Sequence, residues 1–293
     1  MKLDLTSRAY LITGAARGLG AAYARMLCLH GAKVMVNDID AGASRDAAQT
    51  LRDQGFCAGS DSSDISDWDG AHRAVADTHQ AFGRLDGLIC NAGFLRDRSF
   101  HKMSRAEIDD IVKVHLMGAI YPVRAAWPIL RDKGFGRIVF TASSSSLWGN
   151  FGQANYDAAK GGLCGLMNAL KLEGAGHGIC VNTVAPLAGT RLATDLFERH
   201  NATDMPTEQV AGIVSYLCSP ECRESGEVYE AGGGFVARVG TRQSEPVVTD
   251  LSRPADAAAA LETLHERPLT RAYSDATQSV EEILRRVEED GWA

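Results

Sequence analysis

The chain has 293 residues, a net charge of −7 and 45% hydrophobic residues, which is enough for one large or two small domains. It has no run of Lys or Arg and no apolar stretch near the ~18 residues of a membrane span, so we expect neither nucleic acid nor a membrane as partner. The seven cysteines show no disulfide or zinc spacing, which predicts a reducing compartment and no metal site. The ends of the chain show no secretory or peroxisomal address, so we expect the protein in the cytoplasm.

The first predicted strand, residues 9–13, leads into a glycine-rich turn and then into a helical pattern that ends at Gly31. The turn reads Gly14-x-x-x-Gly18-x-Gly20. Between a strand and a helix, such a turn lets backbone N–H groups and the helix N-terminus approach a pyrophosphate. Taken alone, it fits a tight turn without a ligand equally well.

A second predicted strand, residues 33–37, ends at Asp38, eighteen residues after Gly20. A carboxylate at this distance suits the adenosine ribose hydroxyls of a dinucleotide. It would also repel a 2′-phosphate, because two unit charges ~4 Å apart interact by about 4 kcal/mol at an effective dielectric near 20. Arg17 in the glycine turn could instead bind the 2′-phosphate of NADP. The alternative, which we favour, is that Arg17 is an ordinary surface arginine. The pattern therefore predicts NAD rather than NADP.

Strand patterns continue to alternate with helical patterns to about residue 229, without a Pro/Gly/Ser linker. The later predicted strands are Leu85 to Asn91, Arg137 to Ser143, Ile179 to Val184 and Glu227 to Glu230. This alternation predicts an α/β fold, a parallel sheet with helices on both faces. Ligands of such sheets bind at the carboxyl ends of the strands, where Asp38, Asn91, Ser143 and Pro186 fall.

Tyr156 and Lys160 stand four residues apart in a predicted helix, so their side chains share one face. A neighbouring cation favours the phenolate, so we expect Lys160 to lower the tyrosine pKa from its usual value of about 10. A phenol tuned in this way can act as a general acid or base near neutral pH. Ser143, thirteen residues upstream, could hold a carbonyl or alcohol oxygen beside it.

Together, the segments from about Leu5 to Val239 resemble the short-chain dehydrogenase/reductase family. The matching residues are Thr13-Gly14-x-x-x-Gly18-x-Gly20, Asp64-Ile65, Asn91-Ala92-Gly93, Ser143, Tyr156-x-x-x-Lys160, Pro186 and Thr190. The resemblance implies a Rossmann-type doubly wound sheet, a tyrosine that donates and accepts the proton, a serine that holds the substrate oxygen, and a lysine that bonds the nicotinamide ribose.

The resemblance also implies a set of residues around the cofactor. These are Gly14, Arg17, Gly18, Leu19, Gly20, Asp38, Ile39, Asp64, Ile65, Asn91, Ala92, Gly93, Tyr156, Lys160, Pro186 and Thr190. In the family, the residue matching Asp64 approaches the adenine, and those matching Pro186 and Thr190 flank the nicotinamide.

A narrower resemblance lies in residues 91–100 and 148–156, which are similar to the (3R)-hydroxyacyl-CoA dehydrogenase unit of peroxisomal multifunctional enzymes. That unit is also known as a 17β-hydroxysteroid dehydrogenase, and related bacterial enzymes stand alone. The resemblance implies oxidation of a (3R)-3-hydroxyacyl-CoA to the 3-ketoacyl-CoA. A 17β-hydroxysteroid or another secondary alcohol is the alternative substrate, and an NAD-sensing scaffold without turnover is an alternative of another class.

The sequence departs from the family at three positions. His115 stands where most members have an asparagine whose main chain holds a proton-relay water, although the multifunctional-enzyme branch resembles this chain here. It is either a relay residue or a packing residue. Cys90 replaces the first asparagine of the usual Asn-Asn-Ala-Gly, and Leu187 replaces a polar residue at the substrate rim.

Several features predict the substrate side. Residues 187–206, directly after the nicotinamide-side proline, are predicted to form a substrate lid. Trp148 and Phe151 could line an apolar acyl or steroid face, or belong to the core. Arginines that could meet the phosphates of a CoA ester, or form local ion pairs instead, are Arg96, Arg98 and Arg105.

The tail differs from the rest of the chain. Residues 254–266 and 274–289 read as amphipathic helices. We therefore expect a single NAD-binding catalytic domain over residues 1–240 and a helical extension over residues 241–293. The extension is expected to pack on its own domain or on a dimer mate. A homodimer or homotetramer is implied by the family, whose members pair through the long helix that carries the tyrosine.

Overall fold

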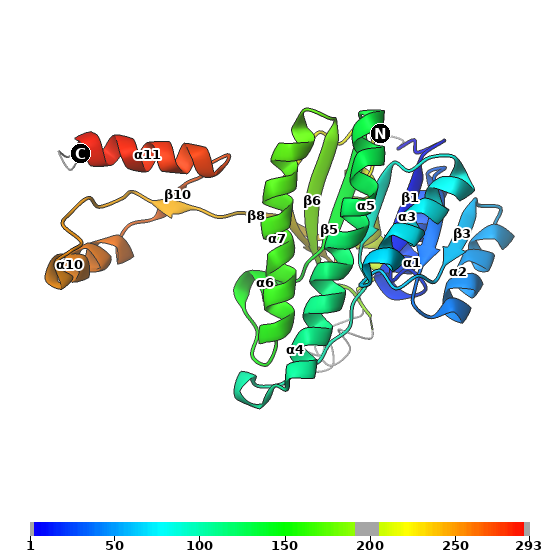
Figure 1. Cartoon of the computed structure of the whole chain (residues 1–293), viewed down its shortest axis with the longest axis horizontal. Helices are drawn as coiled ribbons and strands as arrows, with labels where there is room; N and C mark the ends of the chain where they lie inside the picture. Colours follow the sequence, from blue (N-terminus) through cyan, green and yellow to red (C-terminus); the bar gives the residue numbers. More distant parts are fainter. Residues whose placement is uncertain (1–2, 191–204, 290–293) are drawn as a thin grey trace. The chain divides into compact units, whose positions relative to one another are not determined.

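The computed structural model describes residues 3–190 and 205–289. The chain divides into two units, Met1–Val239 and Gly240–Ala293 (Figure 1). The residues that match the family motifs all belong to the first unit, whereas the second contains the tail with its two amphipathic segments.

An eight-stranded sheet forms the centre of the first unit. In spatial order its strands are β3 (Ala58–Asp61), β2 (Lys33–Asn37), β1 (Ala9–Thr13), β4 (Gly87–Cys90), β5 (Gly136–Thr141), β6 (Ile179–Pro186), β7 (Val228–Gly232) and β8 (Phe235–Val239). Neighbouring strands are parallel except β7 and β8. The order reverses between β1 and β4, and in sheets of this kind ligands bind in the crevice outside the carboxyl ends of the strands at that point. The predicted Rossmann-type sheet is confirmed.

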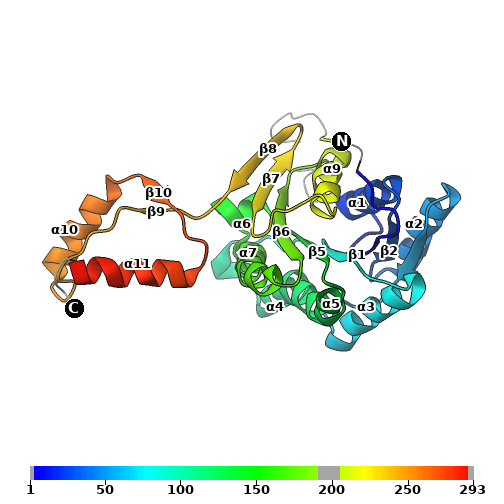
Figure 2. The same ribbon diagram turned by 90° about the horizontal axis from the view of Figure 1, so that it is seen from above.

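Helices cover both faces of this sheet (Figure 2). One face carries α1 (Gly18–Leu29), α2 (Ala41–Asp53) and α9 (Thr207–Leu217), and the other carries α3 (Trp68–Phe82), α5 (Gly118–Lys133) and α7 (Ala154–Ala175). Side chains of a strand alternate between the two layers. In β1, Tyr10 and Ile12 pack against the first layer and Leu11 against the second, all fully buried.

Two strands of the sheet are absent from the sequence prediction. β3 reads Ala-Gly-Ser-Asp, whose residues have low strand propensity, and only pairing with β2 makes it a strand. β8 follows β7 through Gly233 and Gly234, whose φ angles are +57° and +83°. Two adjacent glycines are a strong signal for such a hairpin, so β8 could have been predicted.

Short elements between β4 and α7 shape the crevice. A 3₁₀ turn, Phe100–Lys102, precedes α4 (Arg105–Val112), which continues as a π-helical turn, Lys113–Met117, directly into α5. Such π turns inside helices occur often at functional sites. After β5, the short helix α6 (Ser144–Trp148) begins at Ser143 as its N-cap. The strand predicted from Arg137 to Ser143 therefore extends two residues too far, because β5 ends at Thr141 and Ser143 caps a helix.

The second unit contains two helices joined to a small antiparallel sheet. Its elements are β9 (Gln243–Ser244), α10 (Pro254–His265), β10 (Leu269–Arg271) and α11 (Ala276–Glu289). The two helices begin and end within two residues of the predicted segments. The pair β9–β10 was not predicted, because segments of two and three residues are too short for a periodic pattern.

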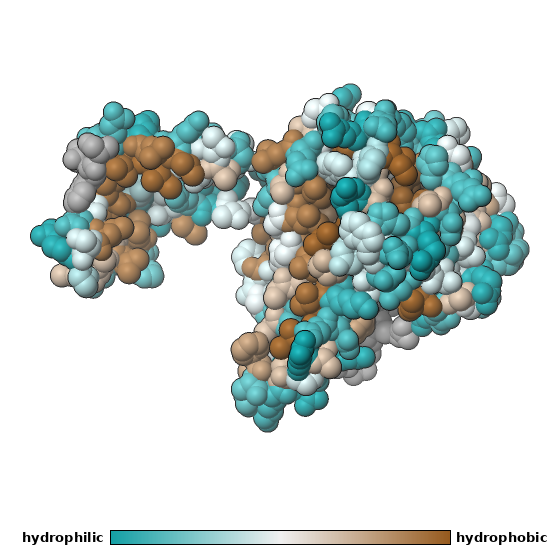
Figure 3. All heavy atoms as spheres, viewed as in Figure 1, coloured by the Kyte–Doolittle hydropathy of each residue, from teal (hydrophilic) through white to brown (hydrophobic). Residues whose placement is uncertain are grey.

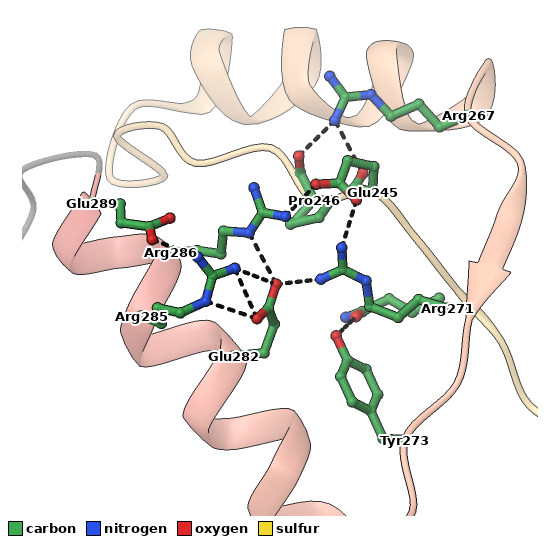
Figure 4. Close-up of polar contacts among 10 residues, drawn as sticks. Glu245, Pro246, Arg267, Arg271, Tyr273, Glu282, Arg285, Arg286 and Glu289 are labelled. Atoms are coloured by element: carbon green, nitrogen blue, oxygen red, sulfur yellow. Dashed lines mark hydrogen bonds and ion pairs between the residues drawn. The ribbon is translucent and has the colours of Figure 1, made fainter.

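Ion pairs join α11 to β10 and to the segment after β9 (Figure 4). The carboxylate of Glu282 binds Arg271, Arg285 and Arg286, and Glu245 binds Arg271 and Arg286. The charged side of α11 thus faces its own unit. Its apolar residues Val280, Ile283 and Leu284 are more than half exposed, as the brown surface over α11 shows (Figure 3).

Candidate active site

The glycine turn between β1 and α1 is shaped by close backbone contacts. Gly14 and Gly18 have φ angles of +61° and +55°, which favour glycine. A Cβ on Gly14 would lie 2.6 Å from the Cα of Ala92, and one on Gly20 would lie 2.3 Å from the Gly14 carbonyl oxygen. Replacement of either glycine would therefore push the turn away from the end of β4.

The end of β4 is bonded to the same turn. The hydroxyl of Thr13 accepts the backbone N–H of Asn91 at 3.0 Å and that of Ala92 at 3.1 Å. The side-chain amide of Asn91 donates to the carbonyl of Gly14 at 3.1 Å. Predicted cofactor residues from two motifs nearly eighty residues apart thus form one rigid wall of the crevice.

The N-terminus of α1 points its first N–H groups toward this crevice. Arg17 is the N-cap residue, and within the described part of the chain no side chain accepts a hydrogen bond at this cap. The first turn has no acidic residue either. A helix end of this kind has unpaired donors and a partial positive charge, which suits a phosphate group.

Asp38 and Ile39 follow β2 at the same edge of the sheet. A carboxylate oxygen of Asp38 accepts the N–H of Ala16 at 3.4 Å, so the acid lies against the glycine turn. Ile39 is largely exposed beside it. Both positions suit the adenosine end of a dinucleotide.

Asp64 and Ile65 follow β3. The Asp64 carboxylate accepts the N–H and the hydroxyl of Ser66 at 2.9 and 2.6 Å. Burial raises its pKa, but the Ser66 bonds outweigh this and the pKa is lowered. The side chain of Ile65 lies in the core against Gly118, and its role is therefore packing.

The segment after β6 approaches the glycine turn from the other side. Pro186 pairs with Ala231 of β7, and a Cβ on Gly18 would lie 3.7 Å from a methyl group of Thr190. Thr190 therefore stands next to the turn, as the family motif implies. Of the predicted substrate lid, residues 191–204 lie outside the described residues.

The catalytic candidates come from β5, α6 and α7. Tyr156, near the start of α7, is buried, and the Ser143 hydroxyl forms a hydrogen bond that lowers its pKa. Ser143 is itself oriented by Ser145, whose N–H donates to the Ser143 oxygen at 3.3 Å and whose hydroxyl lies 3.0 Å from it. Ser145 thus contacts the predicted catalytic serine.

Lys160 lies one helical turn after Tyr156, with 3% of its surface exposed. Its ammonium donates to the carbonyl of Thr141, the last residue of β5, at 2.5 Å. Burial lowers the lysine pKa to about 8. The nitrogen lies 5.8 Å from the centre of the Tyr156 ring. The structure thus brings Ser143, Tyr156 and Lys160 together.

One sequence prediction about this group was wrong. The pKa of Tyr156 is raised to about 12, not lowered. Burial is the main cause, and the nearby charges of Asp157 and Asp97 add to it, while the Ser143 hydrogen bond opposes them. Lys160, expected to lower this pKa, is held by the Thr141 carbonyl instead.

His115 lies in the π-helical turn and is almost fully buried. The N–H of Phe94 donates to its Nε2 at 3.0 Å, and the same nitrogen lies 2.8 Å from the Phe94 carbonyl oxygen. Its ring meets the Tyr156 ring edge-on, with centres 5.0 Å apart. Burial, followed by the charge of Lys160, lowers the His115 pKa to about 3. The imidazole is therefore neutral at physiological pH.

The bare backbone of Gly93 makes room for this ring. A Cβ on Gly93 would lie 2.2 Å from Cε1 of His115. The second ring nitrogen, Nδ1, has no hydrogen-bond partner among the described residues. The predicted cofactor glycine and the predicted relay histidine therefore form one packed unit.

Asn155 is a residue of the site to which the sequence analysis gave no role. Its side-chain amide donates to the carbonyls of Glu107 and Arg96 at 2.7 and 3.3 Å, and its oxygen accepts the N–H of Tyr156 at 2.8 Å. It thus ties the loop after β4 and helix α4 to the start of α7. The sequence signal that could have identified Asn155 was a polar residue directly before the tyrosine.

The three arginines proposed for a CoA ester differ in their contacts. Arg98 pairs with Glu107 at 2.8 Å and Arg105 with Asp109 at 2.9 Å. Arg96 instead lies over the ring of Phe94, 4.8 Å from its centre, and is not paired with a carboxylate in the described ranges. Arg96 is therefore the arginine of the three that could meet an anion.

Trp148 ends helix α6, and Phe151 lies in the turn between α6 and α7. Their exposed fractions are 68% and 90%, so neither belongs to the core. Large apolar side chains this exposed next to a crevice are candidates for ligand contact.

Comparison with known proteins agrees with this geometry. The family described as short chain dehydrogenase matches residues 8–204. A short-chain type dehydrogenase/reductase of Mycobacterium tuberculosis is 42% identical over 243 residues, covering 79% of this chain and 84% of the relative. Hydroxyacyl-CoA dehydrogenase ChsB1 of the same organism is 35% identical, covering 80% of each chain.

Similarity to a solved structure extends over nearly the whole chain. Full-length peroxisomal multifunctional enzyme type 2 from Drosophila melanogaster matches with a TM-score of 0.79 at 29% identity. The match covers 99% of this chain but 52% of that enzyme. The chain belongs to the short-chain dehydrogenase/reductase family and is an oxidoreductase acting on CH–OH groups. The resemblance read from the sequence, including the multifunctional-enzyme branch, is confirmed.

Proposed function

We propose that this protein is an NAD-dependent dehydrogenase that oxidises a (3R)-3-hydroxyacyl-CoA to the 3-ketoacyl-CoA. The observation that carries the chemistry is the group Ser143, Tyr156 and Lys160, gathered at the carboxyl end of β5 beside the glycine turn. Both tyrosine and lysine are present and buried together, which favours an enzyme over a scaffold that binds NAD without turnover.

The residues of the crevice fit a dinucleotide. The uncapped N-terminus of α1 offers N–H donors for the pyrophosphate. Asp38, held at the glycine turn, offers a carboxylate to the adenosine ribose hydroxyls, which supports NAD over NADP. Thr190 and Pro186 stand on the opposite side of the turn, where the nicotinamide end would lie.

Each catalytic residue has a distinct task in this proposal. Bound NAD supplies the acceptor for the hydride that leaves the alcohol carbon. The Ser143 hydroxyl, oriented by Ser145, holds the alcohol oxygen, and the Tyr156 oxygen takes its proton. Because burial raises the tyrosine pKa, the phenolate needs a stabilising charge, a task that we assign to the Lys160 ammonium, 5.8 Å from the centre of the Tyr156 ring.

Support for the acyl-CoA substrate comes from the rim and from the relatives. Hydroxyacyl-CoA dehydrogenase ChsB1 is similar over most of its length, and the chain also matches part of a peroxisomal multifunctional enzyme. At the rim, Arg96 offers a cation for a CoA phosphate, and Trp148 and Phe151 offer apolar surface for the acyl chain. The same apolar surface suits a 17β-hydroxysteroid, which is the competing substrate.

A substrate screen tests this proposal. Purified protein is assayed at 340 nm with (3R)- and (3S)-3-hydroxyacyl-CoA esters of several lengths and with 17β-hydroxysteroids, each with NAD and NADP. We expect turnover of the (3R) esters with NAD. Faster turnover of steroids would select the alternative substrate. Dinucleotide binding without turnover of any alcohol would support the sensing scaffold instead.

For the assembly, we propose a homodimer or homotetramer formed through α5 and α7. A groove of about 620 Å³ between these helices is lined by six apolar and four charged side chains, and brown surface lies over both helices (Figure 3). Its residues are Ile120, Val123, Arg124, Trp127, Pro128, Arg131, Asp132, Leu166, Leu170 and Glu173. Burying such a surface would favour association.

For the C-terminal unit, we propose that residues 241–293 pack on their own catalytic domain or on that of a dimer mate through the apolar side of α11. The charged side of this helix is already engaged by its own unit, which leaves Val280, Ile283 and Leu284 for a further contact. We place the protein in the cytoplasm, because all seven cysteines are free. No helix in the described ranges is long and apolar enough to cross a bilayer.

A further inference from the structure

An ion pair joins the glycine turn to the start of α2. The guanidinium of Arg17 lies 3.3 Å from a carboxylate oxygen of Asp40, with about half of each side chain exposed. Arg17 is the cation that the turn itself offers to the adenosine end of the crevice. In this structure that cation is engaged by a carboxylate two residues after Asp38.

Asp40 is held in place independently of Arg17. Its Oδ1 accepts the N–H groups of Gly42 and Ala43, both at 3.1 Å, as the N-cap of α2. Its own N–H donates to Asp38 at 3.1 Å. These bonds fix the backbone and one oxygen of Asp40, and they leave the other oxygen, Oδ2, directed at Arg17.

The charges around the expected ribose position therefore favour an uncharged sugar. Asp38 and Asp40 contribute two carboxylates and Arg17 one cation that is already paired. A 2′-phosphate would bring a charge of about −1.5 to −2 into this surrounding. It would meet repulsion from Asp38, and it would have to draw Arg17 away from Asp40 to gain a contact.

We propose that Asp40 is a cofactor-specificity residue, because it holds Arg17 away from the 2′-phosphate of NADP. The proposal rests on the proposed NAD-dependent function and adds a second carboxylate to the ribose-facing Asp38. NAD selection is thus shared between an acid that faces the ribose and an acid that engages the one cation of the turn.

The test is a double-mutant cycle on nucleotide binding. NADH and NADPH are titrated by their fluorescence against the wild-type protein, D40N, R17A and the double variant, without any alcohol substrate. Asn is as good an N-cap as Asp, so D40N removes the charge and keeps the cap of α2. D40S, which also preserves the cap, guards against an effect peculiar to asparagine, and thermal melts verify folding.

We expect D40N and D40S to tighten NADPH binding about tenfold, the value of one charge-assisted phosphate contact, and to change NADH binding little. In the R17A background, D40N should give only the small gain that comes from removing a negative charge. An unchanged NADPH affinity in D40N, or an equal gain with and without Arg17, overturns the proposal. Tighter NADPH than NADH binding by the wild type would reject the proposed cofactor separately, and the cycle would still decide the role of Asp40.

Discussion

The glycine turn and the catalytic pocket lie at the same edge of the sheet but are built in different ways. The turn is made of backbone contacts: bare Cα atoms, N–H groups and the side chains that cap them, as at Gly14 and Thr13. The pocket is made of buried polar side chains from separate helices, among them Tyr156, Lys160 and His115. The first region is fixed by close backbone contacts and glycine geometry, whereas the second depends on burial, which also sets the pKa values.

The sharpest test of this contrast is Tyr156→Phe. Removing the phenol should lower kcat about a thousandfold, the size of a general acid–base contribution, because the alcohol proton loses its acceptor. NADH affinity, which the turn provides, should stay nearly unchanged. Steady-state kinetics at 340 nm and NADH titration measure the two effects.

Tyr10→Phe is the matched control. Tyr10 is also a fully buried tyrosine, but its hydroxyl donates to the carbonyl of Cys218 at 2.7 Å, in the core and not in the pocket. This variant should lose some stability and keep its kcat. Tyr156→Phe with wild-type turnover would show that the proton is taken by another group.

How far the sequence predicted each region follows from this contrast. The turn was predicted with its glycines and Asp38, because glycines at this spacing after a strand, with an acid at the end of the next strand, form a recognisable sequence motif. The Rossmann-type fold came from the alternation of strand and helix patterns. The β3 strand was missed because Ala58–Asp61 becomes a strand only through its neighbour.

For the pocket, the sequence predicted which residues lie together but not their surroundings. Spacing in one helix placed Tyr156 and Lys160 on one face, but it contains no measure of burial. Burial raises the pKa of Tyr156 and lowers that of Lys160, so the predicted direction for the tyrosine was wrong. The contacts of Asn155 with Glu107 and Arg96 join segments far apart in the chain and could not be read from local pattern.

A second test concerns the buried charge of Lys160. Lys160→Met should lower kcat about a hundredfold, because the Lys160 ammonium lies 5.8 Å from the centre of the Tyr156 ring, and a unit charge at ~6 Å is worth about 3 kcal/mol at an effective dielectric near 20. The same change should stabilise the fold at pH 7 by about 1 kcal/mol. Removing a buried charge gains on the order of 3 kcal/mol, and leaving the Thr141 carbonyl without its donor offsets much of that.

The stability difference between Lys160→Met and the wild type should depend on pH, and the direction follows from the lysine pKa values. The folded-state pKa of Lys160 is about 8, below the unfolded value of about 10.5, so the unfolded chain binds more protons between these values. The burial penalty is fully present below pH 8 and is relieved as the pH rises to 10.5. The stability advantage of Lys160→Met, measured by urea unfolding, should therefore shrink over this window. A constant advantage would show that the pKa of Lys160 is the same in the folded and the unfolded protein.

Lys133→Met is the contrasting variant. The Lys133 ammonium lies 2.8 Å from the fully buried carboxylate of Asp86, so this lysine has a partner that Lys160 lacks within the described residues. Its removal should destabilise the protein by about 2 kcal/mol, because Asp86 keeps only its arginine partners. If Lys160→Met raises the free energy of unfolding and Lys133→Met lowers it, the buried charge of Lys160 destabilises the fold, whereas the paired charge of Lys133 does not.

The smallest expected effect belongs to His115, where the two regions meet. His115→Ala should lower kcat about tenfold, because Tyr156 loses an edge-on ring contact and the Phe94 peptide loses its anchor. Since the His115 pKa is about 3, the pH profiles of kcat for the variant and the wild type should run parallel between pH 5 and 9. His79→Ala, which changes an exposed histidine on α3, is the control.

The same pKa makes a prediction about stability. The unfolded imidazole binds its proton near pH 6.5 and the folded one near pH 3, so the unfolded chain holds more protons in between. Wild-type stability should fall as the pH drops from 6.5 toward 3, and His115→Ala should lack that part of the fall. A limb in the wild-type kcat profile near pH 6.5 that disappears in His115→Ala would assign His115 to proton transfer. Parallel profiles with lower kcat would instead assign it to holding Tyr156 against the loop that begins at Asn91, which joins the pocket to the glycine turn.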